Sequence, residues 1–206
     1  MSANPKPVDA PVSTLPRDGR RARRHRSRDL AVDALLDLLD EGVPRPTAQQ
    51  VAERSGVSLR SIFRIFDDVD SLHSEAAARQ FERNRHLYVD VPPTGPLDRR
   101  IKAMVEMHER LYSTVAPVRR AAKRAASASP GLAASLELAH KWLRAEVDRA
   151  FGPELTQLDA PATTAAVELL LSFEAWDHLA SVQELGVTAR RSAVIGAVTT
   201  LLAPAG

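Results

Sequence analysis

The 206-residue chain contains no cysteine, and aromatic residues make up only 4% of it. The lack of cysteine excludes disulfides, cysteine-ligated zinc and thiol catalysis, which fits a reducing compartment. No apolar run approaches the roughly eighteen residues that a membrane-spanning helix needs, because Glu168 interrupts the best candidate, around 169–171. The first sixteen residues contain four prolines and lack the apolar stretch of a signal peptide. We therefore expect a cytoplasmic protein without a membrane span.

Common catalytic signatures are missing as well. The sequence has no glycine-rich phosphate loop and no serine nucleophile elbow. Three histidines fall on different expected helices, each near an acidic residue: His108, His140 and His178, with Glu106, Glu137 and Asp177. Their spacing is not the close pair of a metal-binding helix. We expect no enzyme activity, no cofactor and no metal site, and keep a metal-dependent helical enzyme or sensor as a less favoured alternative.

Two short helices joined by a tight turn are predicted between residues 47 and 66. The Thr47 hydroxyl can cap the first helix while Gln50 reaches back to it. Gly56 lies where the chain must turn sharply, and glycine reaches positive φ without a Cβ penalty. Ser58 can then cap the second helix. This spacing is typical of a helix-turn-helix.

The second of these helices has an apolar inner face formed by Ile62, Ile65 and Phe66. Its outward-facing residues are Leu59, Arg60, Ser61, Phe63 and Arg64. Such a helix fits the major groove of DNA, with its N-terminal residues nearest the base edges. An ordinary helical hairpin inside a bundle would give a similar pattern and is the alternative.

A run of arginines directly upstream favours DNA binding over that alternative. The whole chain has a net charge of only +2, so this positive charge is local. The run consists of Arg17, Arg20, Arg21, Arg23, Arg24, Arg26 and Arg28. We interpret residues 1–28 as a disordered basic arm, with the five arginines between positions 20 and 26 as DNA contacts. Guanidinium groups can bind phosphates or enter a narrow minor groove, whereas a solvated tail is the other interpretation of such a run.

The rest of the sequence shows only helical periodicity, with no segment that alternates like a strand. Helices are predicted over about 29–40, 67–90, 101–112, 117–127, 132–152, 161–185 and 188–202. The predicted fold is therefore all-α. An N-terminal three-helix helix-turn-helix domain, residues 29–72, is joined by a long helix to a C-terminal helical bundle, residues 73–206, for ligand binding and dimerisation.

The C-terminal helices carry apolar surface that one subunit cannot cover alone. Residues 165–173 are apolar on nearly every side except at Glu168. Gly196 and Ala197 in the last helix allow close approach of another helix. We therefore predict a homodimer through the two C-terminal helices, which form a four-helix interface across a two-fold axis.

A small-molecule site inside the bundle has seven candidate lining residues, which are apolar or amphipathic and lie on converging segments. They are Met104, Met107, His108, Tyr112, Trp142, Phe173 and Trp176. Most residues of this kind are ordinary core residues. His108 and Tyr112 form the best polar pair, because they lie four residues apart on one helical face. The sequence leaves open whether they line a pocket or belong to the core.

The segment 47–72 resembles the tetracycline-repressor (TetR) family of bacterial transcription regulators. Residues 56–58 look like the glycine, apolar residue and serine that begin the family's motif, and residues 63–66 look like the aromatic-x-x-Phe pattern that ends it. Residues 70–72 are similar to the acidic-x-Leu pattern that opens the family's fourth helix. Three residues depart from the family's pattern. Phe63 stands where the family usually has tyrosine, Ile65 where it commonly has histidine or tyrosine, and Val69 where it usually has lysine.

The resemblance implies a role for each outward residue of the motif. Thr47, Ser58, Ser61 and Phe63 would lie on the DNA backbone, and Leu59, Arg60 and Arg64 nearer the bases. It also implies an internal pocket whose occupation moves the fourth helix. We expect a sequence-specific regulator, a repressor that a small apolar ligand releases from a palindromic operator. The alternative is a dimeric activator or constitutive repressor without an effector.

Overall fold

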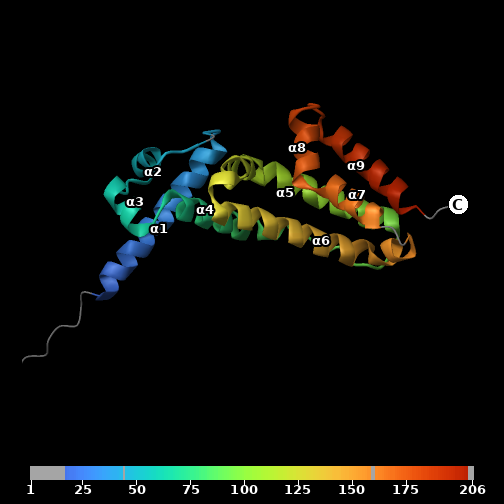
Figure 1. Ribbon diagram of the computed structural model, residues 1–206, viewed down its shortest axis with the longest axis horizontal. Helices are drawn as coiled ribbons and strands as arrows, with labels where there is room; N and C mark the ends of the chain where they lie inside the picture. Colours follow the sequence, from blue (N-terminus) through green and yellow to red (C-terminus); the bar gives the residue numbers. More distant parts are fainter. Residues whose placement is uncertain (1–16, 44, 159–160, 204–206) are drawn as a thin grey trace, which may run out of the picture.

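The computed structural model describes residues 17–43, 45–158 and 161–203, and all regular structure in these ranges is helical. Figure 1 shows an elongated molecule with the N-terminal helices at one end and the long helices of the C-terminal bundle running away from them. None of the helices in the described ranges is long and apolar enough to cross a membrane.

Four helices form the N-terminal end: α1 (Arg17–Asp40), α2 (Ala48–Ser55), α3 (Leu59–Ile65) and α4 (Val69–Arg83). Their apolar faces share one core, in which Leu35 of α1, Val51 of α2 and Ile62 of α3 are almost fully buried. Val118 and Ala121, from a much later helix, belong to the same core. The N-terminal end is thus completed by the C-terminal bundle.

The first helix begins earlier than the sequence analysis predicted. Residues 17–28 were interpreted as part of a disordered arm, yet α1 starts at Arg17 and its first turns project beyond the neighbouring helices (Figure 1). Arginine is a good helix former, and after Pro16 only Gly19 interrupts the run of helix-compatible residues. Residues 1–16, the other part of the expected arm, lie outside the described residues.

The C-terminal bundle follows a 3-10 turn, η1 (Arg85–Leu87). Its helices are α5 (Leu97–Ala125), α6 (Pro130–Leu158), α7 (Pro161–Leu171), α8 (Phe173–Ser181) and α9 (Val187–Leu202), with a second 3-10 turn, η2 (Ala126–Ala128), between α5 and α6. α5 and α6 run along the long axis, and α7 and α9 cover them (Figure 1). The core between these helices includes Met104, Phe151 and Val198, each with no exposed surface.

Several predicted helix boundaries were wrong. α4 ends at Arg83 rather than near residue 90, and α5 is one helix through Pro117 instead of two. Proline removes the donor for the carbonyl of Ser113, but Ser113 is exposed, so water can satisfy that carbonyl. The predicted helix 161–185 is divided at Ser172, whose side chain caps α8 by accepting from the Ala175 amide at 3.2 Å.

α6 continues through Gly152 and Pro153, although the sequence predicted its end there. Arg100 of α5 stabilises this turn, because its guanidinium donates to the Ala150 carbonyl at 2.5 Å and forms an ion pair with Glu154. A side chain from another helix thus holds the backbone where the local sequence favours a break.

Candidate functional site

The helix-turn-helix is fixed by hydrogen bonds that lie within a few residues of the turn. The Thr47 hydroxyl accepts from the Gln50 amide at 3.2 Å, and the Thr47 amide donates to the Gln50 side chain at 2.9 Å. Gly56 has a φ of 69°, and its amide closes α2 by donating to the Ala52 carbonyl at 3.0 Å. The predicted capping box and glycine turn are both confirmed.

α3 presents the two faces that its sequence predicted. Ser58 caps it by accepting from the Ser61 amide at 3.2 Å, while Ile62 and Ile65 are buried. Arg60, Phe63 and Arg64 are exposed on the outer face, and Phe63 is 55% exposed despite its apolar ring. Leu59 and Ser61 are half-buried, and Thr47 and Ser58 are exposed.

The projecting part of α1 adds positive charge at the same end of the molecule (Figure 1). Its exposed arginines are Arg20, Arg21, Arg23, Arg24 and Arg26. Arg28, the last arginine of the run, is instead held against the fold, since it forms an ion pair with Glu75 of α4 at 2.5 Å and lies over the Phe66 ring. The free basic surface of α1 therefore ends before Arg28.

Ion pairs attach α4 to α1. Arg79 of α4 pairs with Asp29 at 2.5 Å and with Asp33 at 3.1 Å, and Arg83 pairs with Asp33 at 2.8 Å. α4 also packs against α6 of the bundle. α4 is thus in contact with both the N-terminal helices and the bundle.

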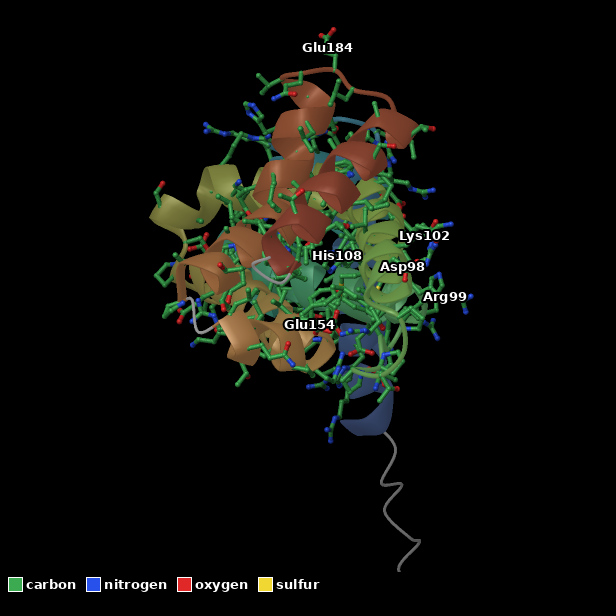
Figure 2. The ribbon with its side chains drawn as sticks, turned by 90° about the vertical axis from the view of Figure 1, so that its right-hand side faces the viewer. Asp98, Arg99, Lys102, His108, Glu154 and Glu184 are labelled. Carbon is green, nitrogen blue, oxygen red and sulfur yellow. The ribbon has the colours of Figure 1, made fainter. Side chains whose placement is uncertain are left out.

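A small cavity of about 20 Å³ lies in the bundle between α5, α7, α8 and α9. His108 and Tyr112 of α5, Trp176 of α8, and Arg190 and Arg191 of α9 form its polar and aromatic walls. Figure 2 shows His108 in the interior of the bundle. A space of this volume is large enough for about one water molecule.

His108 is 3% exposed, and neither of its ring nitrogens has a hydrogen-bond partner among the described residues. Burial, aided by the positive charge of Arg119, lowers the pKa of His108 to about 3, so the ring is neutral near pH 7. The ring stacks on Tyr112 with centroids 5.1 Å apart. Tyr112 is satisfied, because its hydroxyl donates to the Leu171 carbonyl at 2.9 Å, and burial raises its pKa.

Glu109, next to His108 in sequence, is the centre of a buried polar cluster. Its carboxylate accepts from the Trp176 indole at 3.0 Å and from the Ser113 hydroxyl at 3.2 Å. Arg190 forms an ion pair with the same carboxylate and also lies over the Trp176 ring. The charges of Glu109 and Arg190 thus compensate each other inside the bundle.

Only three of the seven residues proposed to bind a ligand line this cavity: His108, Tyr112 and Trp176. Met104, Met107 and Phe173 are fully buried by packing against their neighbours. Trp142 of α6 packs edge-on against Tyr88, with ring centroids 4.4 Å apart. These four residues do not border the cavity.

Sequence reasoning missed Glu109, Arg190 and Arg191, which do line the cavity. Glu109 and Arg190 are 81 positions apart, and each looks like a surface residue on its own helix. No local pattern signals such a pair. The histidines named in the metal hypothesis are not brought together either, since no three histidine or acidic side chains of the described ranges are placed to hold a metal ion.

No protein-family model and no curated protein matches the chain, but solved structures do. A transcriptional regulator from Rhodococcus sp. Rha1 is 20% identical, with a TM-score of 0.59, over 86% of this chain and 96% of that chain. A protein of Streptomyces coelicolor A3(2), described as a transcriptional regulator, is 21% identical, with a TM-score of 0.58, over 86% of this chain and 98% of that chain.

A third structure, from Syntrophomonas wolfei strain Goettingen, is assigned to the TetR family of transcriptional regulators. It is 12% identical, with a TM-score of 0.52, over 90% of this chain and 98% of that chain. All three likenesses span the N-terminal helices and the bundle together, so they concern the whole architecture.

Proposed function

We propose that this chain, which has the all-α fold of TetR-type transcriptional regulators, binds DNA sequence-specifically as a homodimer. It acts as a repressor that a small, largely apolar ligand releases from a palindromic operator. The observation that carries the proposal is the outer face of α3, where Arg60 and Arg64 are exposed on a helix whose start and inner face are fixed by caps and core packing.

In this proposal the outer residues of the helix-turn-helix divide into two groups. Arg60 and Arg64, with Leu59, approach the base edges in the major groove, where an arginine can bond guanine bidentately. The residues that contact the sugar-phosphate backbone are Thr47, Ser58, Ser61 and Phe63. Phe63 has no hydroxyl to donate, so its contact is apolar, and phosphate affinity comes from elsewhere.

The exposed arginines of α1 supply that affinity. They lie on a helix, so only one side of it can meet the DNA backbone at a time. Their contact with phosphates carries no sequence information but makes binding depend on salt concentration.

The homodimer uses the outer surfaces of α7 and α9. Leu169 on α7 is 62% exposed and Ala165 is also exposed, while α9 exposes Ala193 and Gly196. A Cβ added at Gly196 would meet no atom within 4 Å, so a helix of a second subunit can approach there. A two-fold dimer presents one recognition helix to each half-site, which is why the operator should be a palindrome.

The dimer is tested by Leu169→Glu, which places a charge in the proposed interface. We expect this variant to be monomeric by light scattering, since a buried leucine contributes about 1.5–3 kcal/mol and each dimer has two copies. The matched control is Leu138→Glu on α6, where the native leucine is 68% exposed outside the proposed interface. A dimer that persists in Leu169→Glu places the interface elsewhere.

The regulator function is tested by selecting duplexes from a random DNA pool at near-physiological salt and sequencing those that bind. We expect an inverted repeat, with each half contacted by one α3. Enrichment of no sequence, with binding lost at modest salt, would contradict the proposal.

Ligand control is tested by melting the protein in the presence of apolar metabolites. A ligand at about one hundred times its dissociation constant adds about 2.7 kcal/mol to the folded state. A ligand that both stabilises the protein and releases the selected duplex establishes an inducible repressor. Selection of DNA without any such ligand would instead support a constitutive repressor or an activator.

A further inference from the structure

The cavity in the bundle holds hydrogen-bonding groups that the described part of the chain leaves without partners. Both ring nitrogens of His108 are buried and unpaired, and so is Nε of Arg191. Both residues border the cavity. Unpaired buried groups of this kind are rare in folded proteins, because each is costly to remove from water. Because both residues border one space, a polar group placed there is within reach of both.

The charge of the cavity indicates the sign of that group. The Glu109 carboxylate accepts from Arg190, Trp176 and Ser113, so its charge is already neutralised. Arg191 is the remaining charged group on the wall, and no described side chain pairs with it. The cavity therefore offers one uncompensated positive charge, which favours an anion.

The hydrogen-bonding groups of the cavity wall indicate the shape of the bound anion. A neutral imidazole has one N–H, and Nε of a guanidinium has one as well. Two donors from two different helices, α5 and α9, match the two acceptor oxygens of a carboxylate. The rest of the wall is apolar and includes Leu170, Leu179 and Val194. An apolar body with one anionic group is the complement of such a surface.

We propose that this cavity binds an amphipathic monocarboxylic acid, whose carboxylate accepts hydrogen bonds from His108 and Arg191 and whose apolar chain lies against Leu179 and Val194. The inference rests on the proposed function, since it names the chemical class of the effector. The carboxylate replaces the single water that the cavity can contain.

The apolar chain needs more room than the cavity gives, and α8 is the wall that can provide it. This helix is only nine residues long and is separated from α7 at Ser172. Ion pairs attach it to the end of α5, from Lys123 to Glu174 at 3.0 Å and from Arg120 to Asp177 at 2.7 Å.

Displacement of α8 would therefore act on the end of α5. Val118 and Ala121, on that same part of α5, lie in the core of the N-terminal helices. The route from the carboxylate to the helix-turn-helix thus runs through α8 and α5, in addition to α4.

The experiment is calorimetric titration of the full chain with straight-chain carboxylates from butanoate to decanoate, each compared with the alcohol and the amide of the same length. One charge-assisted hydrogen bond is worth about tenfold in affinity. We expect at least one acid to bind about tenfold or more tightly than its alcohol and amide. Arg191→Gln should reduce that ratio to near one, while Arg191→Lys should retain part of it.

The matched control is Arg110→Gln, which removes an exposed arginine of α5 and should leave the ratio unchanged. Melting curves of each variant confirm that it is folded. The inference is overturned if alcohols bind as tightly as acids, if the ratio survives in Arg191→Gln, or if no acid of the series binds.

The same preparation is titrated with the selected duplex, which separates the two proposals. DNA binding that no acid affects overturns the inference alone. If the protein binds an acid but selects no DNA, the proposed acid-binding cavity is supported and the regulator function is overturned.

Discussion

Replacing the five exposed arginines of α1 by glutamine tests how this helix meets DNA. They are Arg20, Arg21, Arg23, Arg24 and Arg26. Successive residues of an α-helix are about 100° apart around its axis, so at most about three of the five fall within any sector of about 100°. Each phosphate that is neutralised contributes about 0.9 to the slope of log affinity against log salt. A helical α1 therefore contributes at most about 2.7 per subunit, whereas an extended arm with all five in contact would contribute about 4.5.

The assay is fluorescence anisotropy with a labelled duplex recovered by selection, titrated over a range of salt concentrations. Arg110→Gln, which removes an exposed arginine of α5 instead of α1, is the control for loss of a positive charge. Single substitutions should divide the five arginines into about three that reduce the slope and two that do not. For a dimer on two half-sites, the fivefold variant should lose at most about 5.4 in slope, whereas an extended arm in each subunit would lose about 9. A loss near 9 would refute the helical geometry, and an unchanged slope would show that α1 makes no phosphate contacts.

Three further results are expected. Arg60→Ala or Arg64→Ala should relax preference at one base pair by about 1–3 kcal/mol, measured by competition with singly substituted operators, whereas equal weakening on all sequences would make the residue a phosphate contact. Glu109→Gln should lower the unfolding free energy by about 3–5 kcal/mol in denaturant titrations, because it leaves the Arg190 guanidinium buried without its counter-charge. The control Glu137→Gln removes an exposed i,i+4 pair and should leave the unfolding free energy almost unchanged. Equal losses in the two variants would refute the buried pair. Burial holds the pKa of His108 at about 3 against 6.5 for an exposed histidine, so stability should fall as the pH drops below 6.5, by about 2 kcal/mol at pH 5, and His108→Gln should remove this part of the pH dependence.

The N-terminal end was largely predictable because its signals act over a few residues. Thr47 and Ser58 cap the helices that follow them, and Gly56 takes the left-handed conformation that the turn needs. Each of these residues determines backbone geometry without help from a distant part of the chain. The resemblance to a known family rested on the same segment, and the fold of the three solved structures agrees with it.

The bundle was less predictable because distant contacts override its local signals. Pro117, Gly152 and Pro153 are sequence signals for helix ends, yet α5 and α6 continue through them. At Gly152 and Pro153, the backbone is held by Arg100 of another helix, α5, and no local pattern can show such a contact. Conversely, Ser172 gives only a weak signal in an apolar stretch, and there the helix does break.

The residues of the cavity were also hard to predict from local sequence patterns. His108 and Tyr112 could be selected from sequence as a polar pair on one helical face. Two other residues of the cavity wall, Arg190 and Arg191, lie on a helix whose charged residues look solvated in the sequence alone. The sequence predicted an apolar ligand, and the carboxylate proposed for that ligand depends on Arg191, which only the structure brings to the cavity.

The placement of Val118 and Ala121 in the N-terminal core has a consequence for dissecting the protein. A fragment cut after α4 would lose both side chains and leave an apolar gap against α1, in a unit that is already small for independent folding. Such a fragment should be aggregation-prone or only partly folded, while the full chain should melt in one cooperative transition. A helix-turn-helix transplanted from this chain to another scaffold must therefore bring the end of α5 with it.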